Sequence, residues 1–409
     1  MSEQYDLIIV GAGPAGCTLA LQMAETGLKI AILEKDHFPR KKICGDALSG
    51  KVMNVLKRLP DPVYHEFLQL KPKVPSMGIR FTAPDGKNLD LPFFIRDGNQ
   101  HDAPGYICPR EEFDHFLFKQ LERFPNINTF EGVKVERTIA NDKGVMVHTA
   151  SGSFFSKMIA GADGINSKVR SLVHPQSIEK KHYCLGIRQY YRNIGNLHPE
   201  NFIELIFLEE LLPGYLWIFP GPEGISNVGI GMLQSQVSEK RLNMSGLFNK
   251  LITSHPLLEH RFHQAEPIGK TEAHRLPLGT LDIPKSGNRC LVIGDAAFLV
   301  DPFSGEGIGN AMASAEVASR ILKQCFLQNT FTSEFLKTYD RNIERRIGHE
   351  MKVNAIIQRL AHSPGLINFV VGKARKNKLV SELLREMYTN ADAKKKLTRP
   401  GFYLGLLWR

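Results

Sequence analysis

Long apolar runs are missing from this 409-residue sequence. A membrane-spanning helix needs roughly 20 consecutive apolar residues, and no window approaches that length. The first residues also lack the basic region of a secretory signal, because the acidic Glu3 and Asp6 flank the start of an apolar segment. We therefore expect a cytoplasmic protein.

Cysteine pairs at metal-binding or redox spacing are missing as well. The six cysteines are scattered and form no CxxC motif: Cys17, Cys44, Cys108, Cys184, Cys290 and Cys325. In a cytosolic chain of this length we expect reduced thiols, most of them buried as small apolar side chains. The sequence therefore predicts neither a disulfide framework nor a metal centre.

Acidic residues are scarce near the C-terminus. Residues 373–409 hold ten bases and three acids, within a net charge of +10 for the whole chain, and end in an apolar and aromatic patch at 402–408. Bases beside interfacial aromatics suit a bilayer surface better than a nucleic acid groove. One interpretation is peripheral contact with the inner face of the membrane, with no nucleic acid partner. The other is a solvated helix whose terminal segment docks on the core.

The N-terminal segment has the pattern of a nucleotide-binding βαβ unit. The run at 5–10 predicts a buried parallel strand, a helix follows to about Thr26, and residues 28–33 predict the next strand. The turn between the first strand and the helix is rich in glycine: Gly11, Ala12, Gly13, Pro14, Ala15 and Gly16.

This turn fits the GxGxxG pattern of dinucleotide sites. Gly11 permits the tight turn, Gly13 lets the backbone approach a pyrophosphate, and Gly16 lets the helix pack on the strand. The phosphates then lie at the positive end of the helix. Glu34 ends the next strand 18 residues after Gly16, where its carboxylate accepts hydrogen bonds from a ribose 2′-OH.

Two later segments add to this site. Asp163 and Gly164 belong to a GADG turn, and Gly294 and Asp295 belong to a GDAA turn that closes a buried strand. Asp295 is there placed to bind ribityl or ribose hydroxyls. The segment that follows this turn predicts the start of a helix whose free N–H groups can face an anion. We assign four of its residues to the site: Pro302, Gly305, Gly307 and Ile308.

The nucleotide signals are discontinuous, with strand-like sequence between them. A small β-meander is expected over 128–159, a large antiparallel sheet over 183–232, and helix over most of 305–390. We predict a mixed α/β fold in which a Rossmann-like domain is interleaved with an antiparallel β-sheet substrate domain. The nucleotide-binding domain is assigned to 1–72, 104–175 and 275–330, the substrate domain to 73–103 and 176–274, and a helical C-terminal region to 331–409.

Over about residues 1–330 the sequence resembles flavoprotein hydroxylases of the para-hydroxybenzoate hydroxylase type. The shared motifs are GxGxxG, GADGxxSxVR at 161–170, and GDAAHxxxPxxGxG at 294–307, with Phe298 in place of the histidine. The resemblance implies an FAD cofactor and a contact between Arg110 and its phosphate or ribose. It also assigns four further residues to the cofactor site: Lys35, Arg40, Cys44 and Gly45.

Two motifs narrow the resemblance to the geranylgeranyl reductase family. Residues 42–46 resemble its KxCG(G/D) loop, and residues 215–220 match its YxWxFP signature. The proline that usually precedes this signature is one position late, at Pro213 instead of Leu212. Flavin-dependent halogenases have a related WxWxIP motif, but no halogenase-like catalytic lysine motif is found.

The family resemblance implies reduction of isolated C=C bonds in polyprenyl lipids by reduced FAD. Cys44 is the candidate group near the reacting carbon, although it equally fits a small residue wedged beside the flavin. Tyr215 and Trp217 lie on one sheet face, where they line an apolar channel or form aromatic core. The electron donor, NAD(P)H or a reduced carrier, is not indicated, because no second GxGxxG unit is present.

Two other functions fit the same motifs. A flavin monooxygenase or halogenase-like enzyme would use the fold for oxygen chemistry on an apolar substrate, because fold does not fix function. A flavin-binding protein without catalysis is the third, and the intact flavin motifs argue against it.

Overall fold

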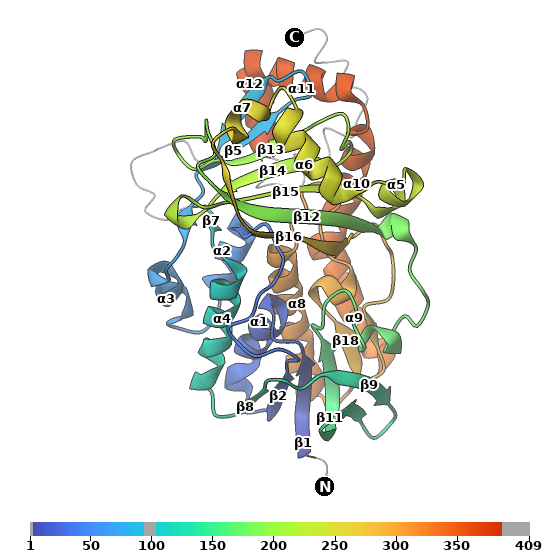
Figure 1. Ribbon diagram of the computed structural model, residues 1–409. Coiled ribbons are helices and arrows are strands. Elements are labelled where there is room, and N and C mark those ends of the chain that lie inside the picture. Colours follow the sequence, from blue (N-terminus) through green and yellow to red (C-terminus); the bar gives the residue numbers. More distant parts are fainter. Residues whose placement is uncertain (1–2, 94–103, 387–409) are drawn as a thin grey trace.

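The computed structural model describes residues 3–93 and 104–386 (Figure 1). The basic and aromatic end of the chain beyond residue 386, on which part of the membrane prediction depends, lies outside the described residues. In the part described, no helix is long and apolar enough to cross a membrane, and no metal-binding cluster of His, Cys, Asp or Glu occurs.

An eight-stranded sheet, which we call sheet A, fills the lower half of Figure 1. Its main path runs β17-β18-β11-β1-β2-β8, and β9 and β10 extend β11 as an antiparallel meander. The strands are β1 (Glu3–Val10), β2 (Ile30–Leu33), β8 (Ile127–Phe130), β9 (Val135–Ala140), β10 (Val145–Thr149), β11 (Gly152–Gly161), β17 (Ser286–Gly287) and β18 (Cys290–Val292). This arrangement confirms the predicted βαβ start and the meander.

Helices cover sheet A because its central strands are apolar on both faces, with the whole of β2 buried. The helices of this half are α1 (Pro14–Met23), α2 (Gly50–Leu56), α3 (Val63–Gln69), α4 (Arg110–Gln120), α8 (Ile308–Leu327) and α9 (Ser333–Ile343). Helix α8 packs against both α1 and α2. The helix expected after Pro302 is therefore confirmed.

A seven-stranded sheet, sheet C, crosses the upper half of Figure 1 in the order β16-β12-β15-β14-β13-β5-β6. Its pairs are antiparallel except β13 with β5. The strands are β5 (Gly78–Thr82), β6 (Asn88–Pro92), β12 (Tyr183–Arg192), β13 (Ile203–Ile206), β14 (Tyr215–Pro220), β15 (Ser226–Leu233) and β16 (Glu266–Pro277). The predicted antiparallel sheet is thus present.

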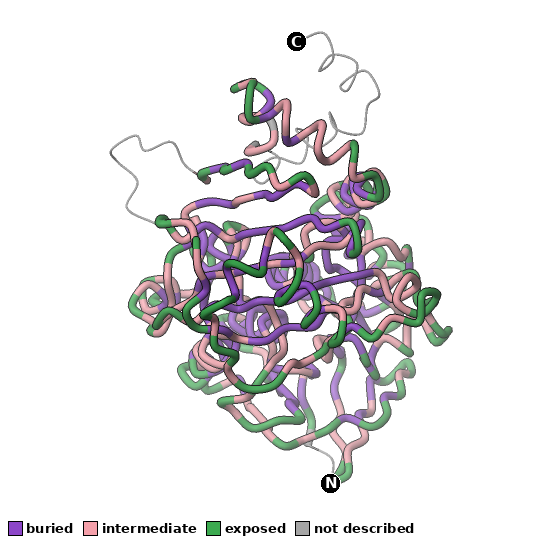
Figure 2. Tube along the Cα trace, turned by 45° about the horizontal axis from the view of Figure 1, so that its top comes forward, coloured by how far each residue is buried: buried purple, intermediate pink, exposed green. Residues whose placement is uncertain are grey.

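The two faces of sheet C have different neighbours. One face buries Leu216 and Ile218 of β14 against Phe248 of α6, and the other carries the alternate residues of β14. The helices beside this sheet are α5 (Gln234–Glu239), α6 (Met244–Ser254) and α7 (Glu259–Phe262). A small sheet of β3 (Ala47–Leu48), β7 (Tyr106–Ile107) and β4 (Val74–Pro75) lies between the large ones. Figure 2 shows the buried stretches running along the strands inside the molecule.

The C-terminal helices reach from sheet A to the free edge of sheet C. Helix α10 (His349–Leu360) follows α9 through a π-helical turn, and α11 (Pro364–Lys376) and α12 (Lys378–Glu386) contact β6. Figure 1 shows α11 and α12 beyond β5 and β13, at the end of the molecule opposite the N-terminus. The exact domain boundaries predicted from the sequence stay predictions.

All six cysteines are free thiols, as expected, and four of them are buried: Cys17, Cys108, Cys290 and Cys325. Burial raises the pKa of the Cys108 thiol to about 12, so this group stays protonated at neutral pH. Cys44 and Cys184 are half-buried. Only Cys44 of the six lines the central cavity described next.

Candidate flavin and substrate site

A cavity of about 1540 Å³ lies between sheet A and sheet C. It extends from the glycine-rich loop, past the 41–45 loop, to the inner face of β14 and to α10 and α11. Most of the site residues predicted from the sequence line it: Gly11, Gly13, Pro14, Ala15, Glu34, Lys35, Arg40, Cys44, Gly45, Arg110, Asp163, Gly164, Tyr215, Trp217, Asp295, Gly305, Gly307 and Ile308. Gly16, Gly294 and Pro302 are not on this lining.

The three motif glycines have different neighbours. A Cβ at Gly11, where φ is +97°, would lie 2.4 Å from the Ala162 carbonyl oxygen, and one at Gly16 would lie 1.9 Å from the Gly11 oxygen. These two positions are glycine because the protein's own backbone passes there. A Cβ at Gly13 would meet nothing closer than Arg40 Nη2 at 3.5 Å. Gly13 therefore keeps space free in the cavity, as the close approach of a pyrophosphate requires.

Glu34 is fixed beside this loop. Its carboxylate accepts hydrogen bonds from the Ala12 N–H (2.8 Å) and the Asp36 N–H (3.1 Å), and its side chain is almost fully buried. A carboxylate has lone pairs beyond these two bonds. The geometry therefore fits the predicted contact with ribose hydroxyls.

Two arginines converge on Asp114 of α4. Arg110 donates two hydrogen bonds to its carboxylate, at 2.7 and 2.8 Å, and Arg40 Nη2 lies 3.3 Å from it. Burial lowers the pKa of Arg110, but the charges of Asp114 and Cys44 outweigh this effect and raise it. Among the described residues, the buried Nε of Arg40 has no hydrogen-bond partner. A donor left over in this cavity fits an anionic ligand group, which is what FAD phosphates supply.

Asp163 and Asp295 lie at the ends of neighbouring strands. Asp163 accepts hydrogen bonds from the N–H groups of Lys168 (2.6 Å) and Val169 (3.4 Å), so it holds its own turn, and burial raises its pKa. Asp295 follows β18 and lines the cavity. Gly294 before it has φ +60° and would place a Cβ 3.3 Å from Ala15, which explains how a residue off the lining still shapes the site.

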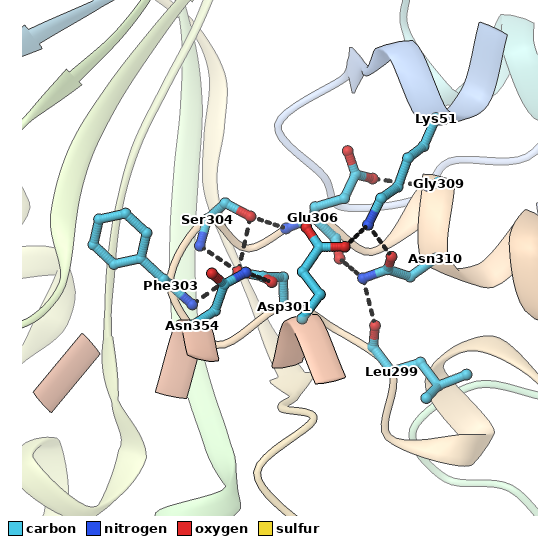
Figure 3. A network of polar contacts seen from close by, with 10 residues as sticks. Lys51, Leu299, Asp301, Phe303, Ser304, Glu306, Gly309, Asn310 and Asn354 are labelled. Atoms are coloured by element: carbon cyan, nitrogen blue, oxygen red, sulfur yellow. Dashed lines mark hydrogen bonds and ion pairs between the residues drawn. The ribbon is translucent and has the colours of Figure 1, made fainter. Parts of the chain in front are cut away.

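The loop before α8 is held by a polar network, drawn in Figure 3. Asp301 accepts hydrogen bonds from the N–H groups of Phe303 (3.0 Å) and Ser304 (2.7 Å), and from Asn354 of α10. The carbonyl of Pro302 accepts another from Gln358 of α10 (2.5 Å). The C-terminal region therefore fixes the helix start that the sequence assigned to anion binding.

The cavity face of β14 carries three alternating aromatic residues, Tyr215, Trp217 and Phe219. The Tyr215 hydroxyl donates to the Ser304 carbonyl at 2.6 Å, and burial raises the pKa of this phenol. The Trp217 Nε1–H donates to Asn227 Oδ1 at 3.0 Å. Both aromatic side chains are thus oriented on the cavity lining, and both also pack against the core beside sheet C.

The loop that contains Cys44 is tied to sheet C by Asp46 and Asn227. Asn227 Nδ2 donates to the Cys44 carbonyl and to Asp46 Oδ2, each at 2.8 Å. Tyr190 also donates to Asp46, at 2.7 Å. Burial raises the pKa of Asp46 although these hydrogen bonds act in the opposite direction. The sequence reasoning missed Asn227 and Tyr190, because nothing in their own strands marks them.

Beyond the aromatic face the cavity becomes an apolar arm, which we define by its walls in sheet C and in the C-terminal helices. Sheet C contributes Ile79, Phe81, Ile203, Leu205 and Phe207, and the helices contribute Ile357, Leu360, Ile367, Val370 and Val371. The helical wall was not predicted as part of the site. Its only sequence signal was apolar residues at helical spacing, which ordinary core packing produces as well.

Comparisons with known proteins agree with this geometry. A family model described as FAD binding domain matches residues 4–190, and one described as geranylgeranyl reductase catalytic domain matches residues 184–269. The two matches together span residues 4–269 and show an FAD-dependent, geranylgeranyl reductase-like oxidoreductase. Its cofactor is FAD, and the residues around Gly13 and Arg40 fit this group. The digeranylgeranylglycerophospholipid reductase of Methanococcoides burtonii is 27% identical over 370 residues, which cover 88% of this chain and 84% of the relative.

Solved structures share the fold of this protein. A geranylgeranyl bacteriochlorophyll reductase-like protein from Thermoplasma acidophilum superposes with a TM-score of 0.78 at 22% identity, over 93% of this chain and 92% of that one. A flavin-dependent brominase gives 0.75 at 18% identity, over 94% and 93% of the two chains. At these identities the likeness concerns the fold, which reductases and halogenases have in common.

Proposed function

We propose that this enzyme reduces isolated C=C bonds in the chain of a polyprenyl lipid. The observation that carries the proposal is the apolar arm. Its residues line the same continuous cavity as the predicted flavin-site residues and as Trp217. A prenyl chain is apolar throughout, so its burial in such an arm is favourable at about 25 cal/mol per Å². The relatives named as digeranylgeranylglycerophospholipid reductases support this substrate class.

The chain's own residues would hold the cofactor at one end of the cavity. Gly13 admits the pyrophosphate, Arg40 and the start of α1 face its charge, and Glu34 and Asp295 accept hydrogen bonds from hydroxyl groups. The start of α8 would direct its positive dipole end toward the ring system, although the Gly309 N–H already donates to the Glu306 carboxylate at 2.7 Å. These contacts would place the ring between the 41–45 loop and the aromatic face of β14.

Bound FAD, once reduced, supplies hydride for one carbon of the double bond. An isolated alkene has no carbonyl to polarise, so the protein must provide position and a proton. Trp217 and Phe219 would form the wall that positions the chain, and the apolar arm would exclude water from it. Cys44 lines the same cavity, beside Arg110.

Tyr215 is poorly suited to give up a proton. Its hydroxyl hydrogen is engaged by the Ser304 carbonyl, and a Cβ at Gly305 would lie only 3.1 Å from its oxygen. We therefore assign Tyr215 to positioning: it ties β14 to the loop before α8.

Peripheral contact with a membrane would bring the lipid to this arm. The outer helices α11 and α12 carry five described bases, Lys373, Arg375, Lys376, Lys378 and Arg385, and Leu379 is 63% exposed. Basic and apolar side chains together favour an anionic bilayer surface.

Oxygen-dependent chemistry is the second candidate, because halogenases share the fold. An anaerobic incubation separates the two. The enzyme is reduced with dithionite, mixed with geranylgeranyl diphosphate or a geranylgeranylated lipid, and the products are analysed by mass spectrometry. Prenyl chains that gain two hydrogens per double bond without oxygen support the reductase. Products that form only in air, with added oxygen or halogen, support the alternative.

A further inference from the structure

A lysine and a histidine from the two halves of the molecule meet at the cavity. Lys42 lies in the loop before Cys44, and His274 lies on β16, the edge strand of sheet C. Their Nζ and Nε2 atoms are 2.7 Å apart, and both side chains line the cavity. Neither has a carboxylate partner within ion-pair distance among the residues that the structure describes.

The surroundings of this pair keep one of its two groups neutral. Burial and then the Lys42 charge lower the pKa of His274 to about 4, so the imidazole is uncharged at pH 7. Its Nε2 then accepts a hydrogen bond from the Lys42 ammonium in the tautomer that carries its proton on Nδ1. Burial also lowers the pKa of Lys42, which makes its ammonium a stronger acid than that of a surface lysine.

The charged groups close to Lys42 and His274 show which part of the cavity the pair occupies. Those acting on Lys42 are Asp295 after β18, Arg110 of α4, and Cys44 and Arg40 of its own loop. Those acting on His274 are Lys42, Arg110, Arg275 and Lys35. Asp295 and Cys44 belong to the predicted flavin site, so the Lys42 amine stands at the same part of the cavity.

We infer that Lys42, held by His274, supplies the proton that completes reduction of the double bond. This inference rests on the proposed function. One alkene carbon takes hydride from the reduced cofactor, and the other takes a proton from the Lys42 ammonium. The C=C π bond is thereby replaced by two C–H bonds, the alkene is reduced and the cofactor oxidised by two electrons.

The pair also provides for the return of the proton. The neutral Lys42 amine left by the reaction remains hydrogen-bonded to His274, which is half-buried on an edge strand and so reaches water. Solvent returns a proton to this amine, and Nε2 of the imidazole, whose own proton is on Nδ1, again accepts a hydrogen bond from the ammonium that forms. The Tyr215 hydroxyl is less suited, since it donates its hydrogen to the Ser304 carbonyl.

Substitution of Lys42 with chemical rescue tests this assignment. We expect Lys42→Ala to keep its FAD absorbance and to lose at least about 100-fold in the rate at which a prenyl substrate reoxidises the reduced enzyme, the usual share of a general acid. Added ethylamine should restore part of that rate, whereas tetramethylammonium, a cation without a proton to give, should not. Lys143→Ala, in an exposed turn, is the matched control with the wild-type rate.

A wild-type rate in Lys42→Ala, or equal rescue by both cations, would overturn the assignment. If the alanine variant does not keep FAD, Lys42→Met replaces it. A second readout needs no turnover: in the apoprotein, carbamylation of Lys42 by cyanate, followed by peptide mass, should begin at lower pH than that of Lys143. Equal pH dependence of the two lysines contradicts the inference. Should the wild type reduce no prenyl chain at all, the proposed function fails, and the cyanate result still reports on the pair.

Discussion

The indole of Trp217 lies directly against the backbone of Gly229 on the neighbouring strand. A Cβ at Gly229 would stand 2.2 Å from Trp217 Cζ2, and Cβ atoms at Gly186 and Gly231 would lie 3.7 and 3.8 Å from the same ring. Glycines on β12 and β15 therefore form a shelf for the indole. Together with the Asn227 hydrogen bond, these glycines fix the indole on the cavity lining.

Replacing Gly229 by alanine should displace Trp217 and slow reduction of the prenyl chain by roughly 10- to 100-fold, because misplacement by about 1 Å costs rates of that order. Bound FAD, measured by absorbance, should be unchanged. The matched control is Gly372→Ala in α11, where a Cβ meets nothing within 4 Å. A wild-type rate in Gly229→Ala would mean that the indole does not position the substrate.

The glycine-rich loop gives a second pair of variants. Gly13→Ala should unfold at the wild-type temperature but retain little FAD, because its new methyl group occupies only cavity space. Gly11→Ala should lower the free energy of unfolding by about 1–3 kcal/mol, since φ there is +97° and the Ala162 carbonyl blocks the Cβ. Thermal melts of the apoproteins and FAD titration check both results. If Gly13→Ala bound FAD with wild-type affinity, the glycine-rich loop would not be part of the cofactor site.

Filling the apolar arm should change the preference of the enzyme for the length of the prenyl chain without changing FAD binding. Ile203→Trp on β13 adds an indole to the wall of the arm. We expect it to raise KM for a twenty-carbon prenyl chain by about tenfold or more, with a smaller effect on a ten-carbon chain. Ile139→Trp, on an exposed position of β9, serves as the control. Equal effects on both chain lengths would show that the substrate does not enter this arm.

His274 should make stability depend on pH. Its folded pKa of about 4 lies below the ordinary value of 6.5, so between these values the unfolded chain binds the extra proton. Its contribution to stability is therefore present above pH 6.5 and is lost as pH falls toward 4, at up to about 1.4 kcal/mol per pH unit. The difference between wild type and His274→Gln in urea unfolding should follow this slope. Parallel curves for the two proteins would contradict a buried neutral imidazole.

Much of the flavin end of the site was readable from local sequence. Gly16 is required by a backbone contact within its own βαβ unit, Gly11 has a φ of +97°, and Asp295 lies three residues after its strand. Such short-range constraints leave recognisable patterns. The alternation of Tyr215 and Trp217 likewise follows from the strand period of two residues.

The rest of the site depends on contacts between distant parts of the chain. Lys42 and His274 are 232 positions apart, and Asn227 is 183 positions from Cys44. No local pattern encodes such pairs, because they form only when sheet C closes over sheet A. The helical wall at Leu360 and Ile367 was hidden for another reason: its residues are of the types that fill any core.

The most direct test of the central claim is anaerobic stopped-flow absorbance of the dithionite-reduced enzyme. It is mixed in one experiment with a geranylgeranyl lipid and in another with its fully saturated counterpart. We predict that the oxidised flavin spectrum returns only with the unsaturated lipid, at one flavin per double bond reduced. A flavin that stays reduced with both lipids and is oxidised only when air enters would contradict the assignment of this enzyme as a prenyl reductase.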